Sequence, residues 1–112
     1  MDPLPSVALV RDLIFSTKIS STAKSLGVTV SVVRDPAKLA DAPPASRLIV
    51  DLNLEGALPA AVAWKTKTSG RVIGFASHVD TEVIRAARAA GFDDVVPRSE
   101  FTRLLPELLR PA

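Results

Sequence analysis

Short β-branched runs alternate with longer segments of helical period along this chain. The runs that are typical of buried strands cover residues 6–10, 28–33, 47–51, 71–76 and 94–97. They are apolar almost throughout instead of alternating with polar residues, and a helical segment follows each of them. Such an arrangement predicts a parallel sheet that is covered by helices on both faces.

Each intervening segment carries its own helix signals. The first places Phe15, Ile19 and Ala23 at helical spacing and ends at Gly27, where a helix C-terminal glycine belongs. The second begins near a proline and is short, because two further prolines follow it. Pro106 lies inside the last helix and is expected to kink or shorten it, since proline removes a backbone hydrogen bond. Three longer helices are expected over residues 57–70, 80–91 and 99–109.

The predicted fold class is α/β, a doubly wound (βα)5 sheet of five parallel strands in the order 2-1-3-4-5. Right-handed crossovers leave few other arrangements for five βα units. In sheets of this kind, binding sites lie at the carboxyl ends of the strands, near the switch in strand order. Asp12, Asp51 and the pair Ala76-Ser77 come at the ends of three predicted strands. We therefore expect these residues to gather at one edge of the sheet.

The composition is that of one ordinary globular domain over residues 1–112, with residues 1–5 as a flexible N-terminus. The absence of Cys excludes a disulfide scaffold, thiol catalysis and a zinc ribbon, and the single His excludes a His-rich metal site. No apolar run approaches the roughly 20 residues that span a bilayer, and the first residues lack the features of a secretory signal. We expect a cytoplasmic protein with no membrane partner.

The charge pattern does not favour nucleic-acid binding. The net charge is +2 and the pI is about 9.4, but Lys and Arg are scattered singly along the chain. Trp64 and four Phe are the only large aromatic residues. A nucleic-acid surface usually has a basic stripe, often with aromatic residues on which bases stack. No nucleic-acid partner is therefore expected.

Five short motifs occur in order at the predicted strand ends. They are "VRD" at 10–12, "VDLNLEG" at 50–56, "ASHVD" at 76–80, "GFDDVV" at 91–96 and "RS" at 98–99. With these motifs the chain resembles the receiver domains of two-component response regulators, the CheY-like superfamily, over nearly its whole length. The resemblance implies a flavodoxin-like fold in which Asp51 holds the phosphoacceptor position and Asp12 belongs to an acidic pair. It also implies that any Mg²⁺ would be held by Asp12, Asp51 and the backbone carbonyl of Asn53.

The chain departs from the receiver pattern at positions that the family uses for its chemistry. Arg11 takes the place of the first acid of the pair, and Arg98 replaces the lysine that contacts the phosphoryl group. Ala76 replaces the switch Thr or Ser, with Ser77 beside it as a partial substitute. Val95 lies where the switch aromatic residue is usually found.

These departures oppose Mg²⁺ binding and predict an internal cation in its place. Mg²⁺ demands octahedral oxygen ligation, which carboxylates supply together with substrate oxygens. A guanidinium repels a dication, and even two unit charges about 4 Å apart interact by roughly 4 kcal/mol at an effective dielectric near 20. The same charge favours an ion pair between Asp51 and Arg11 or Arg98, because arginine binds carboxylates bidentately. No cofactor is expected beyond weak Mg²⁺ binding.

The predicted function is that of a stand-alone atypical receiver, or pseudo-receiver, which acts in signal transduction by protein–protein interaction without conventional phosphoryl switching. A switch needs a two-state element that its ligand biases, and Ala76 and Val95 lack the hydroxyl and the ring of that element. The expected partner is another protein, such as a histidine kinase, regulator or effector, or a second copy of the chain. Arg85 and Arg88 lie among alanines and mark the predicted partner face. No catalytic residues and no enzyme activity are expected.

Two other functions stay open, and single residues have plainer interpretations. In a working receiver, Asp51 would be phosphorylated in a phosphorelay, while a small enzyme of unknown chemistry is the other alternative, because clustered charges at strand ends can be catalytic. In the plainer interpretation, Asp51 is a polar cap of the loop that follows its strand. Asp12 is then only the N-cap of the first helix. The "DLNLEG" stretch nearly fits the cobalamin signature D-x-H-x-x-G, but Asn53 replaces the ligating His.

Overall fold

The sheet at the centre of the molecule is parallel throughout. The structure is a computed structural model that describes residues 5–110, so most of the expected flexible N-terminus lies outside it. The strands are β1 (Ser6–Leu9), β2 (Val30–Val33), β3 (Arg47–Asp51), β4 (Arg71–Ala76) and β5 (Asp94–Pro97). Their order in the sheet is β2-β1-β3-β4-β5, which confirms the predicted α/β fold and strand order.

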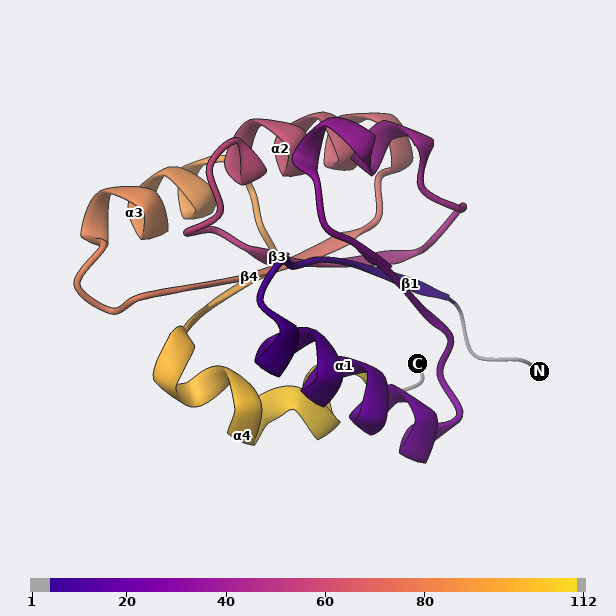
Figure 1. The fold of residues 1–112 in the computed structure, drawn as a ribbon. Coiled ribbons are helices and arrows are strands. Elements are labelled where there is room, and N and C mark those ends of the chain that lie inside the picture. The colour runs from indigo at the N-terminus through magenta and orange to yellow at the C-terminus, as the bar shows by residue number, and fades with distance from the viewer. Residues whose placement is uncertain (1–4, 111–112) are drawn as a thin grey trace.

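Helices cover both faces of this sheet. They are α1 (Leu13–Leu26), the 3₁₀ helix η1 (Pro36–Asp41), α2 (Ala57–Thr68), α3 (Thr81–Ala89) and α4 (Arg98–Leu108). Figure 1 shows α1 and α4 below the sheet, and α2 and α3 above it with the purple coil of η1 beside α2. We call these the lower and the upper face. Within residues 5–110, no helix combines the length and the apolar character needed to cross a membrane.

The strands bury side chains on both faces, because successive residues point to opposite sides. In β3, Leu48 and Val50 belong to the core under η1, α2 and α3, whereas Ile49 belongs to the core formed with α1 and α4. In the lower core, the rings of Phe75 and Phe101 stack with their centroids 4.0 Å apart. The same alternation puts Asp51 on the lower side of the sheet, at its carboxyl edge.

The prolines of η1 and of α4 have different effects on their helices. In η1, Pro36 occupies the first turn and the Asp35 carboxylate caps the helix by accepting from Ala37 N at 3.0 Å. This segment stays short, as predicted, because prolines come directly after it. The last helix, by contrast, continues through Pro106 to Leu108, so its expected shortening is wrong. Pro106 is exposed, and water can bond to the carbonyl group that loses its helical partner there.

Gly74 allows the chain after Asp51 to pack closely on the sheet. A Cβ atom at Gly74 would lie 2.7 Å from Cδ1 of Leu52, which is too close for two carbon atoms in contact. Leu52 is 4% exposed, and its N–H donates to the carbonyl of Phe75 at 2.9 Å. The glycine weakens β4 by propensity, but it fixes the position of the loop that comes after Asp51.

Candidate functional site

Asp51 ends β3 and is one of two buried polar residues in the described part of the chain, with 6% exposure. Its Oδ1 accepts a hydrogen bond from the backbone N–H of Asn53 at 3.0 Å. This contact caps the loop, as expected for a carboxylate at the end of a strand. A buried carboxylate with one such partner keeps most of its charge uncompensated, which is costly in a protein interior. The position therefore favours a cation nearby.

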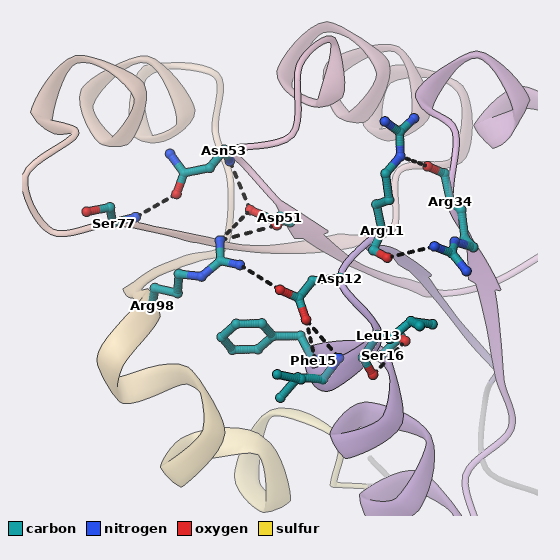
Figure 2. Close-up of polar contacts among 11 residues, drawn as sticks. Arg11, Asp12, Leu13, Phe15, Ser16, Arg34, Asp51, Asn53, Ser77 and Arg98 are labelled. Atoms are coloured by element: carbon teal, nitrogen blue, oxygen red, sulfur yellow. Dashed lines mark hydrogen bonds and ion pairs between the residues drawn. The ribbon is translucent and has the colours of Figure 1, made fainter.

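Arg98, the first residue of α4, supplies that cation. Its Nη1 lies 3.3 Å from each carboxylate oxygen of Asp51, and its Nη2 lies 3.7 Å from Oδ2 of Asp12 (Figure 2). The guanidinium carbon is 4.4 Å from the ring centroid of Phe15 and 5.7 Å from that of Phe75. Aromatic faces attract arginine and hold its planar group in one orientation. The charge of Arg98 is thus fixed between two carboxylates and an aromatic surface.

The carboxylate of Asp12 contacts both the first turn of α1 and the guanidinium of Arg98. Its Oδ1 accepts from the backbone N–H of Ile14 at 2.8 Å and of Phe15 at 3.2 Å, which makes it the N-cap of α1. Its other oxygen faces Arg98. A cap of this kind stabilises a helix by about 1 kcal/mol. Asp12 thus caps α1 and at the same time faces the guanidinium that contacts Asp51.

The side chain of Asn53 turns away from Asp51 and holds the loop between β4 and α3. Its Oδ1 accepts from the backbone N–H of Ser77 at 2.8 Å, and its Nδ2 donates to the Asp80 carboxylate at 2.8 Å. Figure 2 shows the Ser77 hydroxyl pointing away from Asp51. Ser77 therefore joins the cluster through its backbone, and its hydroxyl is not placed to replace that of a switch residue.

Arg11 does not join this cluster, in contrast to the expected pocket position. Its Nε donates to the carbonyl of Arg34 at 3.4 Å, while Nη2 of Arg34 donates to the carbonyl of Arg11 at 3.1 Å. Within residues 5–110 no ion pair joins Arg11 to Asp51, and Figure 2 shows its guanidinium pointing away from that carboxylate. Alternation explains the difference: Leu9 belongs to the upper core and Val10 to the lower one, so Arg11 points upward as Leu9 does.

The two switch positions carry only aliphatic groups. Ala76 ends β4 and is fully buried, and Val95 in β5 is half-buried beside Gly74 of the neighbouring strand. Ala76 offers no hydroxyl to a ligand at Asp51, and Val95 has no ring that could exchange between two positions. The two positions therefore hold a methyl and an isopropyl group, with neither a hydroxyl nor a ring.

The residues of the cluster do not fit a divalent metal. Two carboxylates, those of Asp12 and Asp51, meet at this edge, and no group of three potential ligand side chains occurs within residues 5–110. The guanidinium of Arg98 lies against both carboxylates and brings a positive charge to them. Mg²⁺ needs octahedral oxygen ligation and loses its hydration water reluctantly. The expected weak Mg²⁺ ligation by Asp12, Asp51 and Asn53 therefore has little support in this geometry.

Two further sets of residues bear on the predicted sites. Arg85 and Arg88 are exposed on α3, away from the Asp51 cluster. Sequence reasoning missed the Phe15 and Phe75 rings under Arg98 and the contact of Asp80 with Asn53. A signal for the rings existed in the sequence, because Phe15 lies shortly after the end of β1 and Phe75 one residue before the end of β4.

Comparison with solved structures finds the same architecture in response-regulator proteins. The beryllofluoride-activated receiver domain of DrrB matches with a TM-score of 0.81 and 17% identity, over 94% of this chain and 92% of that one. The receiver domain of the TMAO respiratory system regulator TorR matches with a TM-score of 0.77 and 19% identity, over 95% and 99% of the two chains. The Mn²⁺-bound form of the response regulator Rcp1 matches with a TM-score of 0.79 and 10% identity, over 94% and 91%.

Sequence comparison gives no counterpart to these structural matches. No protein-family model matches the chain, and no curated protein matches it. The identities to the solved structures named above are below 20%, so these likenesses concern the fold and not the chemistry of the site. Strand order, helix placement and coverage agree over nearly the full length of the chain. The chain therefore has the fold of response-regulator receiver domains.

Proposed function

We propose that this chain is an atypical receiver-like signalling domain, which acts through protein–protein interaction and without Mg²⁺-dependent phosphoryl switching. The observation that carries the proposal is the position of Arg98 between Asp51 and Asp12. Its guanidinium provides at this edge the positive charge that a metal would otherwise provide. The domain is thereby held in one electrostatic state.

The electrostatics of the cluster support this proposal. At a separation of 3.3 Å, the Arg98–Asp51 attraction amounts to roughly 5 kcal/mol at an effective dielectric near 20, before desolvation is counted. Metal entry would have to displace the guanidinium from both carboxylates or bind beside it. The first route loses this attraction, and the second adds repulsion between a dication and a fixed cation.

The lack of a switch element supports the second half of the proposal. Phosphorylation acts at a distance only when a bistable element responds to the added charge. Ala76 and Val95 cannot change a hydrogen bond or exchange a ring. A phosphoryl group on Asp51 would therefore have no prepared route to the helices of the upper face.

The partner face in this proposal is the exposed side of α3, with Arg85 and Arg88. Neither guanidinium takes part in an ion pair within residues 5–110, and Ala86, Ala89 and Ala90 around them are exposed. Small side chains allow close approach, and arginine is enriched at interfaces. The partner is another protein, a kinase, regulator or effector, or a second copy of the chain, and the domain has no enzyme activity of its own.

Sedimentation velocity over a range of concentrations tests whether the partner is a second copy of the chain. Self-association should weaken in Arg85→Glu/Arg88→Glu, and it should persist in Asp51→Ala and in the charge-matched control Lys18→Glu/Lys24→Glu on α1. A wild type that is monomeric throughout contradicts the homodimer and leaves a different protein as the partner. Loss of association in Asp51→Ala alone would contradict the proposal that docking is independent of the pocket.

Incubation with acetyl phosphate and Mg²⁺, followed by intact-mass measurement, tests the pocket. We expect no phosphoryl adduct on the wild type, so that neither it nor Asp51→Asn gains mass. The variant Arg98→Lys restores the residue that receivers carry, and it should show whether the fold can be labelled at all. An adduct on the wild type that disappears in Asp51→Asn would show a working phosphoacceptor, which is the second candidate function.

A further inference from the structure

An apolar groove lies on the upper face between η1 and α2, with a volume of about 330 Å³. Figure 1 shows these two helices side by side above the sheet. Apart from Lys67 and Thr68, every residue that lines the groove is Pro, Ala, Leu or Trp. None of its lining residues belongs to the Asp51 cluster, so a ligand of this groove would be independent of the function proposed above.

The groove arises from short side chains on both of its walls. Alanines at positions 40, 42 and 45 lie on the η1 side, and Ala60 and Ala63 lie on the α2 side. The prolines that end η1 prevent a longer helix from covering this space. The buried side chains of Leu39 and Trp64, 2% and 7% exposed, also line it. Water in such a trough finds few hydrogen-bond partners, so an apolar ligand displaces it favourably.

The Trp64 wall is fixed in place by its neighbours. A Cβ atom at Gly70 would lie 2.5 Å from Cη2 of Trp64, so the indole rests directly on the Gly70 backbone. The Thr68 hydroxyl donates to the carbonyl of Trp64 at 2.8 Å and accepts from Gly70 N at 3.1 Å. Thr68 is thereby occupied and offers the groove little polarity. A ligand would meet a preformed wall, which lowers the entropy cost of binding.

Lys67 is the one ionisable residue that lines the groove. It is exposed, and its ammonium makes no ion pair and no hydrogen bond within residues 5–110. The neighbouring Lys65 differs, since its Nζ lies 3.0 Å from the Asp93 carboxylate and 3.2 Å from the carbonyl oxygen of Gly70. The groove thus combines an apolar trough with a single cation that has no partner in the described part of the chain.

We propose that this groove binds a small amphipathic carboxylate, with its apolar body in the trough and its carboxylate on Lys67. The volume lies at the lower end of the range of small-molecule sites, which are mostly apolar with a few placed polar groups. One cation matches one anionic head group, and the scarcity of other polar groups in the lining disfavours sugars and nucleotides. An unbranched chain of about eight carbons suits a site of this size.

Fluorescence of Trp64 reports this site without labelling, because the chain contains one Trp. Titration with octanoate should give a saturable change, with a dissociation constant of roughly 1 mM for a ligand of about ten heavy atoms. Lys67→Met should weaken octanoate binding about five-fold, as expected for a partly exposed ion pair, and leave octanol binding unchanged. Lys24→Met on α1 is the matched control and should bind octanoate as the wild type does.

A second variant tests the trough itself. Ala63→Phe places a ring in the groove and should abolish the response to both octanoate and octanol, whereas Ala89→Phe, at another exposed helical alanine, should not. The proposal is overturned if the wild type shows no saturable change, or if Lys67→Met and Lys24→Met bind octanoate equally well. Should Ala63→Phe not fold, the Lys67 comparison decides the outcome by itself.

Discussion

The ion pair between Arg98 and Asp51 should contribute measurably to stability, and a double-mutant cycle isolates its contribution. Arg98→Met removes the guanidinium and keeps an apolar stem over Phe15. Asp51→Asn removes the charge and keeps an oxygen that can accept from the Asn53 N–H. The free energies of unfolding of the wild type, both single variants and the double variant give the coupling between the two side chains.

The structure sets the size of this coupling. The gross attraction of roughly 5 kcal/mol at 3.3 Å is reduced by the desolvation of both charges. The Asp51 side chain is 9% exposed and that of Arg98 is 30% exposed, so solvent screens the pair less than it screens a surface pair. We expect a coupling of about 1.5 kcal/mol, between the values of exposed and of fully buried pairs.

Urea unfolding followed by far-UV circular dichroism measures all four proteins. The exposed pair Arg71–Asp94, with side chains 64% and 42% exposed, is the matched control and should couple by less than about 0.5 kcal/mol. A coupling for Arg98 and Asp51 that is no larger than this control would contradict the expected charge compensation. It would show that the guanidinium is only near the carboxylate and does not offset its charge.

Three further predictions concern other parts of the fold. Arg47 donates to Ser6 Oγ and to three carbonyls at the end of α4, so Arg47→Met should lower the free energy of unfolding by about 2 kcal/mol. The exposed Arg71 is the control for Arg47, and Arg71→Met should lower the free energy of unfolding by less than about 0.5 kcal/mol. Burial would raise the pKa of Asp93, but the Val72 N–H and the Lys65 ammonium outweigh it and lower this pKa below its ordinary value. Because the pKa of Asp93 is lower in the folded than in the unfolded state, the ionised carboxylate stabilises the fold at pH values above the unfolded-state pKa of about 3.9. This stabilisation is lost as the pH falls through the folded-state pKa. Unfolding measured across this acidic range should be less pH-dependent in Asp93→Asn, and an unchanged slope would contradict the assignment. Gly74→Ala should destabilise by about 1–3 kcal/mol in thermal unfolding, because its Cβ meets Leu52, and a neutral result would show that Leu52 moves aside freely.

The sequence predicted a parallel sheet with helices on both faces because apolar β-branched runs and helix signals agree along the whole chain. Right-handed crossovers then limited the possible strand orders. Runs such as residues 47–51 occur as strands with the predicted bounds. The first two strands begin or end one to two residues inside the predicted runs, since the ends of a run carry no separate signal. The last helix was expected over residues 99–109, but the expected shortening at Pro106 does not occur. Tolerance of Pro106 depends on its exposure, which is a tertiary property.

The candidate site was predictable to the level of strand ends and no further. Carboxyl ends of parallel strands meet at one edge, and this rule predicted that Asp12, Asp51 and the pair Ala76-Ser77 lie close together. The resemblance to receiver domains added Arg98 to this group. Side chains alternate between the two faces along a strand, so the face to which a residue at this edge points depends on its exact distance from the end of the paired strand. Arg11 and Asp12 are neighbours in sequence and lie on opposite sides for this reason. The aromatic support of Arg98 comes from Phe15 and Phe75, whose positions near strand ends were visible in the sequence. That both rings lie against the same guanidinium depends on the packing of α1 on the sheet.

The proposed function depends above all on Arg98, which would hold the pocket in one state and make Mg²⁺-dependent phosphoryl binding unfavourable. Titration of the ¹⁵N-labelled wild type with Mg²⁺ and beryllofluoride, followed by amide resonances, measures this directly. We expect only small, non-saturating shifts near Asp51, and none in α3 or β5. Saturable binding that moves resonances of α3 and β5 together with those around Asp51 would contradict the proposal, because the domain would then bind a phosphoryl mimic and respond as a switch.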